Sequence, residues 1–402
     1  MVRHVTALIL AIACGGSAYG DPADGPGPGS DGARVAAFVE ALRTDAQRRG
    51  ITPATFAAAL ADFTPDPRII AATRKEPEYG RPVGAYVDSL VSAPHVAAGA
   101  AQAARQASLL DAIEKKYGVE RWIILALWGV ESSFGSARDR WDVIRSLATL
   151  AEARYRDPYF RNELLVALRI LQEGHVGRDR MLGSWAGAMG QPQFMPSSFY
   201  DYAVDFSGDG RRDIWTNVPD VLASIGNYMA RSGWQPGLPW GFEVVVPKDF
   251  GYRRSRAAFA EWAKLGFRRA DDGAFPRDGE GFLLFPSGAS GPAFLVTSNF
   301  VVIKRYNNSD TYALAVGHLA DRMHGREPFR TAWPNPDPQL SRDARIGLQR
   351  KMAALGYKIG DFAGRLDFDQ RDAIRDLQAK FGMVPDGHPT PALLERLGVA
   401  PQ

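Results

Sequence analysis

The spacing of apolar residues between Arg34 and about Arg231 constrains the fold of this chain more than any other feature. Apolar residues recur there at intervals of three and four, which places them on one face of an α-helix. The expected helices include Val35–Leu42, Leu109–Tyr117, Trp122–Val130, Asn162–Leu171 and Val221–Ala230. With 402 residues, 46% of them hydrophobic, the chain is too long for one compact domain and too apolar to be disordered or collagen-like. We therefore expect a large, mostly helical body.

The segment from Trp234 to Tyr306 has a different pattern, with short strand-like runs separated by Gly and Pro turns. The expected strands are Phe242–Val246, Phe282–Phe285 and Phe294–Ile303. Helical spacing returns in Thr311–Met323. The predicted fold class is therefore α+β, predominantly α, with a small mixed α/β lobe.

A proline-rich segment, residues 325–339, has almost no apolar period and is expected to be a linker between domains. The unit that follows, residues 340–398, shows helical spacing in Ile346–Leu355 and Ala373–Phe381 and a closing helix at Pro391–Leu397. We expect a C-terminal three-helix domain. Its core is too small to build the walls of a catalytic cleft, so a binding role is favoured over a structural cap.

The N-terminal residues 1–20 are typical of an export signal, because an apolar run, Val5–Cys14, precedes the small-x-small triplet Ala18–Gly20. The run is too short to span a bilayer. Residues 21–33, rich in Gly and Pro, are expected to be a linker. An exported, periplasmic protein is expected. A buried N-terminal helix is one alternative, and lipoprotein cleavage before Cys14, which would anchor the chain in an outer membrane, is another.

Charge and cysteine content exclude several classes of function. The net charge is only +3 and the basic residues are scattered, so no nucleic acid partner is expected. The one cysteine, Cys14, excludes an internal disulfide, and the six histidines form no zinc motif. Any catalysis by this chain should therefore depend on oxygen acids.

Glu131 is a carboxylate near the end of an otherwise apolar helix. Leu127 and Trp128 lie on the same helix face, so partial burial should raise the pKa of the Glu131 carboxyl. A protonated carboxyl could donate its proton to a glycosidic oxygen and later act as a base. The alternative is a structural glutamate paired with an arginine such as Arg138 or Arg145, and this helix taken alone favours that alternative.

The segment Gly183–Ser197 combines small residues, amide side chains and aromatic rings in one loop. Small residues allow a ligand to approach the backbone closely. Ser184 and Gln193 can form hydrogen bonds with sugar hydroxyls, and Trp185 and Phe194 offer flat faces for pyranose rings. The alternative is a tight packing turn.

Three sequence blocks together resemble the membrane-bound lytic murein transglycosylase B family. They are Glu131 within G-V-E-S-S-F-G, the segment G-A-M-G-x-x-Q-F-M-P-S, and Y-N-x-S-x-x-Y-A-x-A-V from Tyr306 to Val316. The resemblance implies a lysozyme-like catalytic domain, residues 34–324, that cleaves the bond between N-acetylmuramic acid and N-acetylglucosamine without water and without a cofactor. Glu131 would first protonate the glycosidic oxygen and then assist the muramoyl C6 hydroxyl in closing a 1,6-anhydro ring.

The same resemblance assigns further positions to the substrate. These are Tyr86, Arg156, Ser184, Gln193, Tyr306, Asn307 and Tyr312, and Phe194 joins the expected substrate-binding residues through its flat ring. Tyr86 matches more loosely than the others, and the segment around Arg156 is one residue shorter than the family pattern, which leaves a surface arginine as its alternative. Glycosidases that use water generally need a second carboxylate. Asp139 and Asp142 follow Glu131 but are expected to pair with neighbouring arginines.

The segment Asp205–Gly210 fits the first half of an EF-hand calcium loop, although its twelfth position is Thr216 rather than Glu. The residues alone leave an Asp-Gly turn equally open. The family resemblance implies a structural Ca²⁺ or Na⁺ site whose last carboxylate comes later. The expected ligands are Asp205, Ser207, Asp209, the backbone carbonyl of Arg211, and Asp220.

The C-terminal unit resembles the type-one peptidoglycan-binding domain. The resemblance rests on Leu348-Gln349, Leu355-Gly356-Tyr357, Ala373-Ile374, Leu377-Gln378 and Asp386-Gly387, with a departure at Asp361–Asp367. Tethering by such a domain would raise the local substrate concentration. The expected partners are peptidoglycan glycan strands and other cell-wall enzymes, and the chain is expected to be a monomer. A water-using muramidase on the same fold and a non-catalytic wall-binding scaffold are the alternative functions.

Overall fold

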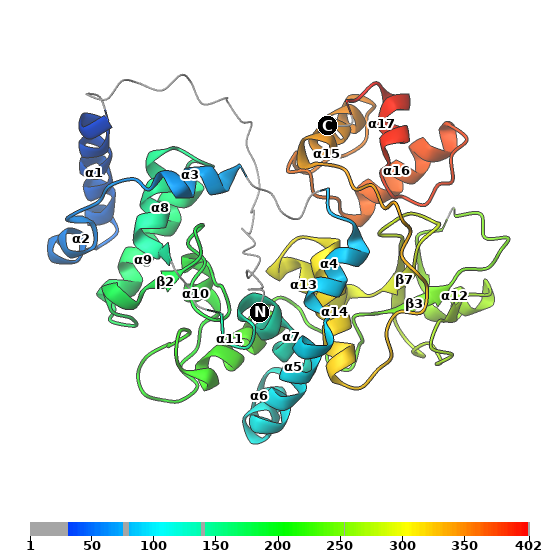
Figure 1. Cartoon of the computed structure of the whole chain (residues 1–402), viewed down its shortest axis with the longest axis horizontal. Coiled ribbons are helices and arrows are strands. Elements are labelled where there is room, and N and C mark those ends of the chain that lie inside the picture. The colour runs from blue at the N-terminus through cyan, green and yellow to red at the C-terminus, as the bar shows by residue number, and fades with distance from the viewer. Residues whose placement is uncertain (1–30, 75–79, 138–140, 253, 401–402) are drawn as a thin grey trace, which may run out of the picture. The chain divides into compact units, whose positions relative to one another are not determined.

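The computed structural model describes residues 31–74, 80–137, 141–252 and 254–400 (Figure 1). The expected signal segment 1–20, Cys14, and residues 138–140 with Asp139 lie outside these ranges. The described residues form two compact units, one holding 31–74 and 127–231, the other 80–126 and 232–400. Helices predominate in both, which confirms the predicted α+β class with a mostly helical composition.

The first unit is built around one buried helix. All residues of α8 (Val143–Glu152) except Arg145 are buried, and α8 packs along α9 (Tyr159–Gln172). The other elements of the unit are α1 (Asp31–Arg48), α2 (Pro53–Leu60), α3 (Pro67–Thr73), β1 (Trp141–Asp142), β2 (Leu182–Gly183), α10 (Pro196–Tyr202) and α11 (Val218–Arg231), together with a 3₁₀ turn at Arg178–Arg180. Helix α1 begins at Asp31, inside the expected linker 21–33.

The second unit contains the expected lobe, a five-stranded antiparallel sheet in the order β4-β6-β7-β3-β5. Its strands are β3 (Gly241–Val245), β4 (Arg256–Ala258), β5 (Arg268–Arg269), β6 (Glu280–Leu284) and β7 (Ala293–Val296). The helices of the second unit are α4 (Val83–Leu90), α5 (Ala93–Arg105), α6 (Ala107–Tyr117), α12 (Phe259–Lys264), α13 (Ser298–Tyr306), α14 (Asp310–Met323), α15 (Arg342–Ala354), α16 (Phe368–Lys380) and α17 (Pro391–Leu397). Helix α14 is buried over most of its length and packs on α4, α5 and α13.

The expected strand Phe294–Ile303 is wrong in its second half. The strand ends at Val296, and α13 begins at Ser298 because the Thr297 side chain accepts a hydrogen bond from the backbone N–H of Asn299. Such a hydroxyl satisfies one of the free N–H groups at a helix start. An unbroken apolar run does not distinguish a buried strand from a buried helix, so this cap decides the structure.

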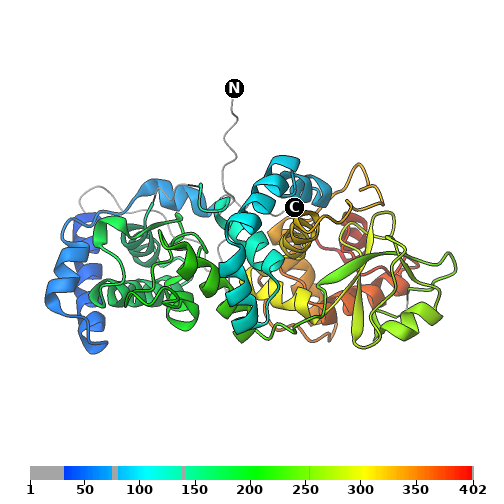
Figure 2. The ribbon, with the colours of Figure 1, turned by 90° about the horizontal axis from the view of Figure 1, so that it is seen from below.

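Helices α15, α16 and α17 form the expected C-terminal three-helix domain and pack around one small core (Figures 1 and 2). Leu348, Met352, Ile374, Leu393 and Leu394 are the fully buried members of that core. Each helix begins with a side-chain cap, from Ser341, Asp367 and Thr390. Both figures show these helices, drawn in orange and red, beside the strands of the lobe.

The segment 325–339 contains no helix or strand, but it is packed into the second unit. The Phe329 ring stacks on His318 with centroids 3.7 Å apart, and Trp333 lies against Gly84, where an added Cβ would be 2.5 Å from the indole. Buried Asp337 accepts hydrogen bonds from the backbone N–H of Val83 and from the Ser287 hydroxyl. The segment 325–339 therefore contacts both α4 and α14 and the lobe, and it holds them together.

A search of the described helices for a stretch long and apolar enough to cross a membrane finds none.

Candidate functional site

Glu131 lies in the last turn of α7 (Arg121–Ser132) and is partly buried. The chain reverses directly after it, through Ser133, Phe134 and Gly135, whose φ angles are 49°, 58° and 76°. Two of these three residues carry a side chain, so the turn is strained. The Phe134 ring meets Trp128 edge to face with centroids 5.7 Å apart, which holds the turn against the helix. The strained turn therefore begins two residues after Glu131, the residue predicted to be the acid.

Gln191 ties this turn to the loop Gly183–Ser197. Its Oε1 accepts a hydrogen bond from the Trp128 indole at 2.7 Å, and its Nε2 donates to the Trp215 carbonyl at 2.8 Å. A Cβ at Gly135 would lie 2.4 Å from Oε1, so a glycine is required there. Gln191 was not predicted from the sequence, because it occupies an unspecified position of the G-A-M-G-x-x-Q motif and its partners are distant in sequence.

The loop itself is held by its own backbone and by Ser184. The Ser184 hydroxyl oxygen accepts hydrogen bonds from the N–H groups of Ala186 and Ala188, and the side chain is fully buried. Met189 and Phe194 exchange two backbone hydrogen bonds, at 2.7 and 3.1 Å. In this structure Ser184 therefore shapes the loop.

Gln193 has a φ of 53°, and its Nε2 donates to the Gly190 carbonyl at 2.8 Å. Phe194, which was expected to present a face to a sugar, is 1% exposed, and its ring packs 5.7 Å from the ring of Tyr228, so the structure shows no open face on it. Phe194 lies just before the start of α10 at Pro196, and its ring is part of the core. A sequence pattern does not distinguish a ring in the core from a ring in a cleft. Trp185 is the aromatic residue of this loop that keeps exposed surface.

Glu163, on α9, is a buried carboxylate of the first unit that was not predicted from the sequence. It accepts hydrogen bonds from the backbone N–H and the hydroxyl of Ser197, at 2.9 and 2.7 Å. Burial raises the pKa of Glu163 above its ordinary value, although the two Ser197 donors oppose the shift. Glu163 thereby supports the end of the loop that carries Gln193. Its spacing from Phe160 on an apolar helix face was the available signal.

Two aspartates near Glu131 in the sequence, the predicted Asp142 and also Asp157, are in ion pairs. Asp142 caps α8 by accepting from the backbone N–H of Arg145 and pairs with Arg178 at 2.7 Å, and Asp157 pairs with Arg154 at 3.2 Å. The expected partnership of Asp142 with a neighbouring arginine is therefore only partly right. Its ion-pair partner, Arg178, is distant in sequence.

Arg156 lies in the turn between α8 and α9, with a φ of 51° and its guanidinium 5.3 Å from the centre of the Tyr155 ring. The side chain is partly buried. A positive φ at a residue with a side chain is uncommon, and it gives this turn a fixed shape.

The remaining predicted substrate residues lie in the second unit, on helices that pack together. Tyr86 is on α4, Tyr306 ends α13, Asn307 follows it, and Tyr312 is in the first turn of α14 (Figure 1). All four are at most 2% exposed. The residues of the other group, Glu131, Arg156, Ser184, Gln193 and Phe194, belong to the first unit.

Asn307 is the one amide among the four predicted substrate residues of the second unit. Its side chain is 1% exposed, and within the described chain neither its Oδ1 nor its Nδ2 has a hydrogen-bond partner. A buried amide without partners is costly unless a ligand or water satisfies it. Asn307 therefore has the character of a binding group. The turn around it is closed by the Ser309 hydroxyl, which accepts from the backbone N–H of Tyr312 at 3.3 Å.

The three carboxylates of Asp205, Asp209 and Asp220 converge, with one oxygen of each within 4.8 Å of the others. Asp220 is fully buried and accepts backbone hydrogen bonds from Phe206, Ser207 and Asp213, which places it under the loop. The sequence prediction that a later aspartate joins the loop agrees with this geometry.

The donor set suits a hard cation. Carboxylate and hydroxyl oxygens are the ligands that Ca²⁺ prefers, and a cluster of three acids repels itself without a cation. Burial alone would raise the pKa of Asp205, but hydrogen bonds from the N–H groups of Gly210, Gly208 and Asp209 hold it below its ordinary value. The Ser207 hydroxyl lies 3.4 Å from an Asp205 oxygen, so it is within reach of the same ion.

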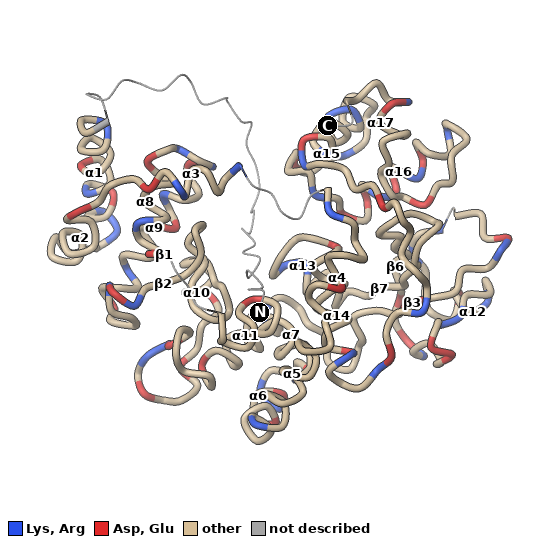
Figure 3. Tube along the Cα trace, viewed as in Figure 1, with Lys and Arg blue, Asp and Glu red and all other residues tan. Residues whose placement is uncertain are grey.

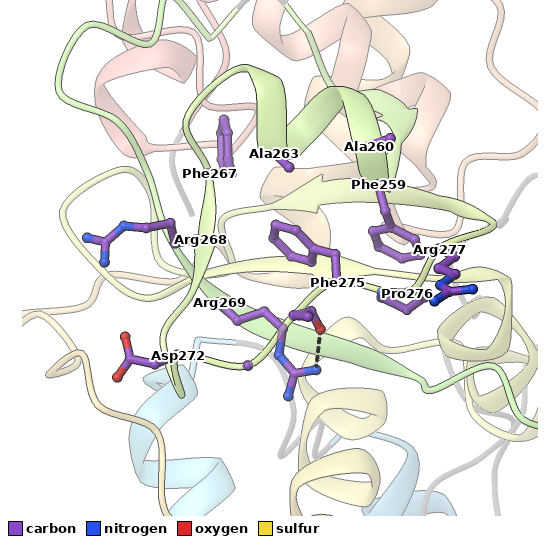
Figure 4. Close-up of a pocket in the computed structure, with 12 residues that line it drawn as sticks. Phe259, Ala260, Ala263, Phe267, Arg268, Arg269, Asp272, Phe275, Pro276 and Arg277 are labelled. Carbon is purple, nitrogen blue, oxygen red and sulfur yellow. Dashed lines mark hydrogen bonds between the residues drawn. The ribbon is translucent and has the colours of Figure 1, made fainter.

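A separate hollow of about 500 Å³ opens on the lobe, between α12 and the loop after β5 (Figure 4). Phenylalanine and arginine side chains line much of it, namely Phe259, Phe267, Phe275, Arg268, Arg269 and Arg277. None of the predicted site residues is among its lining residues. Figure 3 shows acidic and basic residues interspersed along the described parts of both units.

Comparison with known proteins gives two family matches. The transglycosylase SLT domain model matches residues 34–321, and a peptidoglycan binding domain model matches residues 341–397. The membrane-bound lytic murein transglycosylase B of Escherichia coli K12 is 33% identical over 221 residues, which is 52% of this chain and 58% of the relative. The chain therefore spans little more than half the length of that relative.

Solved structures are similar over more of the chain. SltB3 from Pseudomonas aeruginosa, in complex with NAG-anhNAM-pentapeptide, is 44% identical with a TM-score of 0.83 and covers 91% of this chain and 99% of its own. The soluble lytic transglycosylase SltB1 from the same organism is 31% identical with a TM-score of 0.61, covering 73% of this chain and 99% of its own.

Proposed function

Because the chain belongs to the transglycosylase SLT domain family, we propose that it is a lytic transglycosylase that cleaves the MurNAc–GlcNAc bond of peptidoglycan. The products carry 1,6-anhydromuramoyl ends, because the muramoyl C6 hydroxyl takes the place of water. The complex of the similar SltB3 with an anhydromuramoyl pentapeptide supports this choice of substrate and product. The observation that carries the proposal is Glu131, partly buried at a strained helix end that Gln191 ties to the Gly183–Ser197 loop.

Glu131 acts first as an acid and then as a base. It donates a proton to the glycosidic oxygen as the bond breaks, and it then accepts the proton of the C6 hydroxyl as the anhydro ring closes. One carboxylate is sufficient, since the attacking hydroxyl belongs to the substrate and is already positioned. The ion pairs of Asp142 and Asp157 and the Ser197 contacts of Glu163 agree with a single-acid site.

The other predicted residues bind and orient the glycan. Asn307 supplies a buried amide with unused donors and an acceptor, which suits the N-acetyl and hydroxyl groups of the sugars. Tyr86, Tyr306, Tyr312, Gln193 and Arg156 are the further groups we assign to substrate, and Trp185 supplies the exposed aromatic face that Phe194 does not.

The Asp205 loop is assigned to a structural Ca²⁺ or Na⁺. Asp205, Ser207, Asp209 and Asp220 would hold it, together with the Arg211 carbonyl. The ion would fix the loop before α11 and takes no part in the reaction.

The domain boundaries, compartment and partners follow from the same assignment. Residues 34–324 form the catalytic domain and 340–398 the wall-binding domain, which agrees with the extents of the two family matches. Because the proposed substrate is peptidoglycan, we assign the protein to the periplasm, with glycan strands as its partner and a monomeric state.

The test is mass spectrometry of the soluble products released from purified sacculi by the protein, by Glu131→Gln and by Glu163→Gln. We expect anhydromuramoyl products from the unchanged protein, none from Glu131→Gln, and the same anhydro products from Glu163→Gln. Sacculus binding by Glu131→Gln should be retained, which separates lost chemistry from lost folding. Reducing muramic acid ends that vanish in Glu163→Gln would instead establish a water-using muramidase, and binding without any product would establish a scaffold.

A further inference from the structure

The C-terminal domain contacts the turn that contains Asn307. Asp310 is the first residue of α14, three residues after Asn307 and two before Tyr312. Its Oδ2 accepts from Arg371 of α16 at 2.5 Å, and its Oδ1 lies 2.7 Å from Lys304 of α13. One carboxylate therefore joins the end of α13, the start of α14 and the C-terminal domain.

This cluster is buried. Arg371 and Lys304 are 6% and 8% exposed as whole residues. Burial alone would raise the pKa of Asp310, but the charges of Lys304 and Arg371 hold it far below its ordinary value, so the carboxylate is ionised. A buried charge lowers the stability of the fold unless charged partners compensate it. Removing one partner therefore leaves an uncompensated charge and disturbs the structure around Asp310.

Arg371 is held from its own side as well. Its Nη1 donates to the Gly387 carbonyl at 3.1 Å, within the Asp386-Gly387 turn of the C-terminal domain. Asp386 in turn accepts from the backbone N–H of Ala289 in the lobe at 2.8 Å. The Arg371 guanidinium is thus held between the Asp386-Gly387 turn, which contacts the lobe, and the carboxylate of Asp310. Its position on the side of the C-terminal domain is therefore fixed.

We propose that Arg371 is a positioning residue for the cleavage reaction: through Asp310, the C-terminal domain holds the turn Tyr306–Tyr312 in the geometry in which Asn307 meets the glycan. The C-terminal domain then completes the catalytic domain as well as binding the wall. The inference rests on the proposed function, because it takes Asn307 as a substrate-binding residue.

Arg375 provides a matched control. It lies one helical turn further along α16, is 6% exposed like Arg371, and also docks the domain on the lobe, by donating to the Leu283 carbonyl at 2.8 Å. It does not contact Asp310 in any hydrogen bond or ion pair of the described chain. A loss caused only by weaker docking should appear in both variants.

The first test compares Arg371→Met, Arg371→Lys and Arg375→Met in the full chain. The substrate is a short soluble glycan oligomer, and kcat, KM and sacculus binding are measured. We expect Arg371→Met to lower kcat by about tenfold to a hundredfold, since small misplacements of positioning groups have effects of this size. Sacculus binding should be retained, and Arg375→Met should stay within about threefold of the unchanged protein. Arg371→Lys should recover only part of kcat, because a lysine keeps the positive charge but cannot reproduce the contacts of all three guanidinium nitrogens. Equal losses in Arg371→Met and Arg375→Met would overturn the proposal.

The second test does not depend on catalysis. Hydrogen exchange of peptides covering residues 306–312 should become faster in Arg371→Met and remain unchanged in Arg375→Met, because only the first releases the turn. Unchanged exchange in Arg371→Met would refute the positioning role whatever the activity. Failure of the proposed function has a different signature, since the unchanged protein would then release no anhydromuramoyl product.

Discussion

Single residues around Glu131 explain why the chain bends as it does after α7. Gly135 is constrained both by its backbone conformation and by its neighbours. Its φ is 76°, and the Gln191 side chain occupies the position that a Cβ at residue 135 would take. Trp128 and Gln191 together leave the turn little freedom. The position of the acid is therefore determined by neighbours that do no chemistry themselves.

Gly135→Ala should lower activity on sacculi by about tenfold or more, because the new Cβ displaces Gln191 from the Trp128 indole. It should also cost about 1 kcal/mol in the free energy of unfolding through the left-handed φ. The activity is measured by release of soluble products and the stability by thermal unfolding.

Gly174→Ala is the matched control for that variant. Gly174 has a φ of 75° and nothing within 4 Å of an added Cβ, so it carries the same backbone cost without the collision. Activity should remain close to that of the unchanged protein. Equal activity of the two variants would show that Gln191 does not position the turn.

Sequence reasoning identified the residues that carry local signals. Glu131 stood out because it is a charge in an apolar helix, whereas Asp220 was named only because the family resemblance implies a later carboxylate for the Asp205 loop. Gln191 and Glu163 did not stand out, since their roles depend on hydrogen bonds to residues far along the chain. Phe194 was assigned to the substrate because a ring in a loop and a ring in the core have the same sequence.

Among the elements, long helices were predicted well and short ones poorly. Apolar spacing extends over several turns in α9, α11 and α14, whereas β4 and β5 are three and two residues long and have no pattern to detect. Helix α13 was misassigned because its start depends on one capping threonine.

The loop before α11 provides a prediction at this scale. Calcium at a concentration about a hundredfold above its dissociation constant should stabilise the folded protein by about 2.7 kcal/mol, and a chelator should reverse the gain. Asp209→Asn, which changes an exposed ligand, should abolish most of this response. Thermal unfolding with and without Ca²⁺, repeated with Na⁺, measures it.

Asp213→Asn is the control for the loop. Asp213 accepts hydrogen bonds from the backbone N–H groups of Trp215 and Thr216 but lies outside the three-acid cluster. Its variant should be less stable and still respond to calcium. A protein whose unfolding temperature is indifferent to both cations would have no ion site in this loop.

At the scale of the second unit, the polar contacts between the lobe and α16 were not predictable from sequence. The periodicity of residues 340–398 predicted a small three-helix domain, and the composition of 325–339 predicted a linker between domains. The structure instead packs Trp333 and Asp337 of that segment against the unit. Polar contacts such as Arg371 with Asp310 have no periodic signature, so only the structure reveals them.

Buried histidines make the stability of this unit depend on pH. Burial lowers the pKa of His318 and of His388 from 6.5 to about 3. The unfolded chain binds protons on both near pH 6.5 and the folded chain does not, so this stability is present above pH 6.5 and is lost as pH falls towards 3. At pH 5, His318 alone should cost about 1–2 kcal/mol.

His318→Gln isolates that contribution, because carboxylates elsewhere in the molecule also titrate in this range. Thermal unfolding from pH 7.5 to 5 should decline less steeply in the variant than in the unchanged protein. Parallel curves would mean that His318 is protonated in the folded state.

The single-acid reaction is the central claim, and cleavage in H₂¹⁸O tests it most directly. A purified glycan oligomer is digested in labelled water, and the new muramoyl ends are weighed by mass spectrometry. We expect anhydromuramoyl ends that contain no ¹⁸O, because the C6 hydroxyl of the substrate closes the ring. One ¹⁸O atom at a reducing muramoyl end would contradict this, since it shows that water attacked the bond.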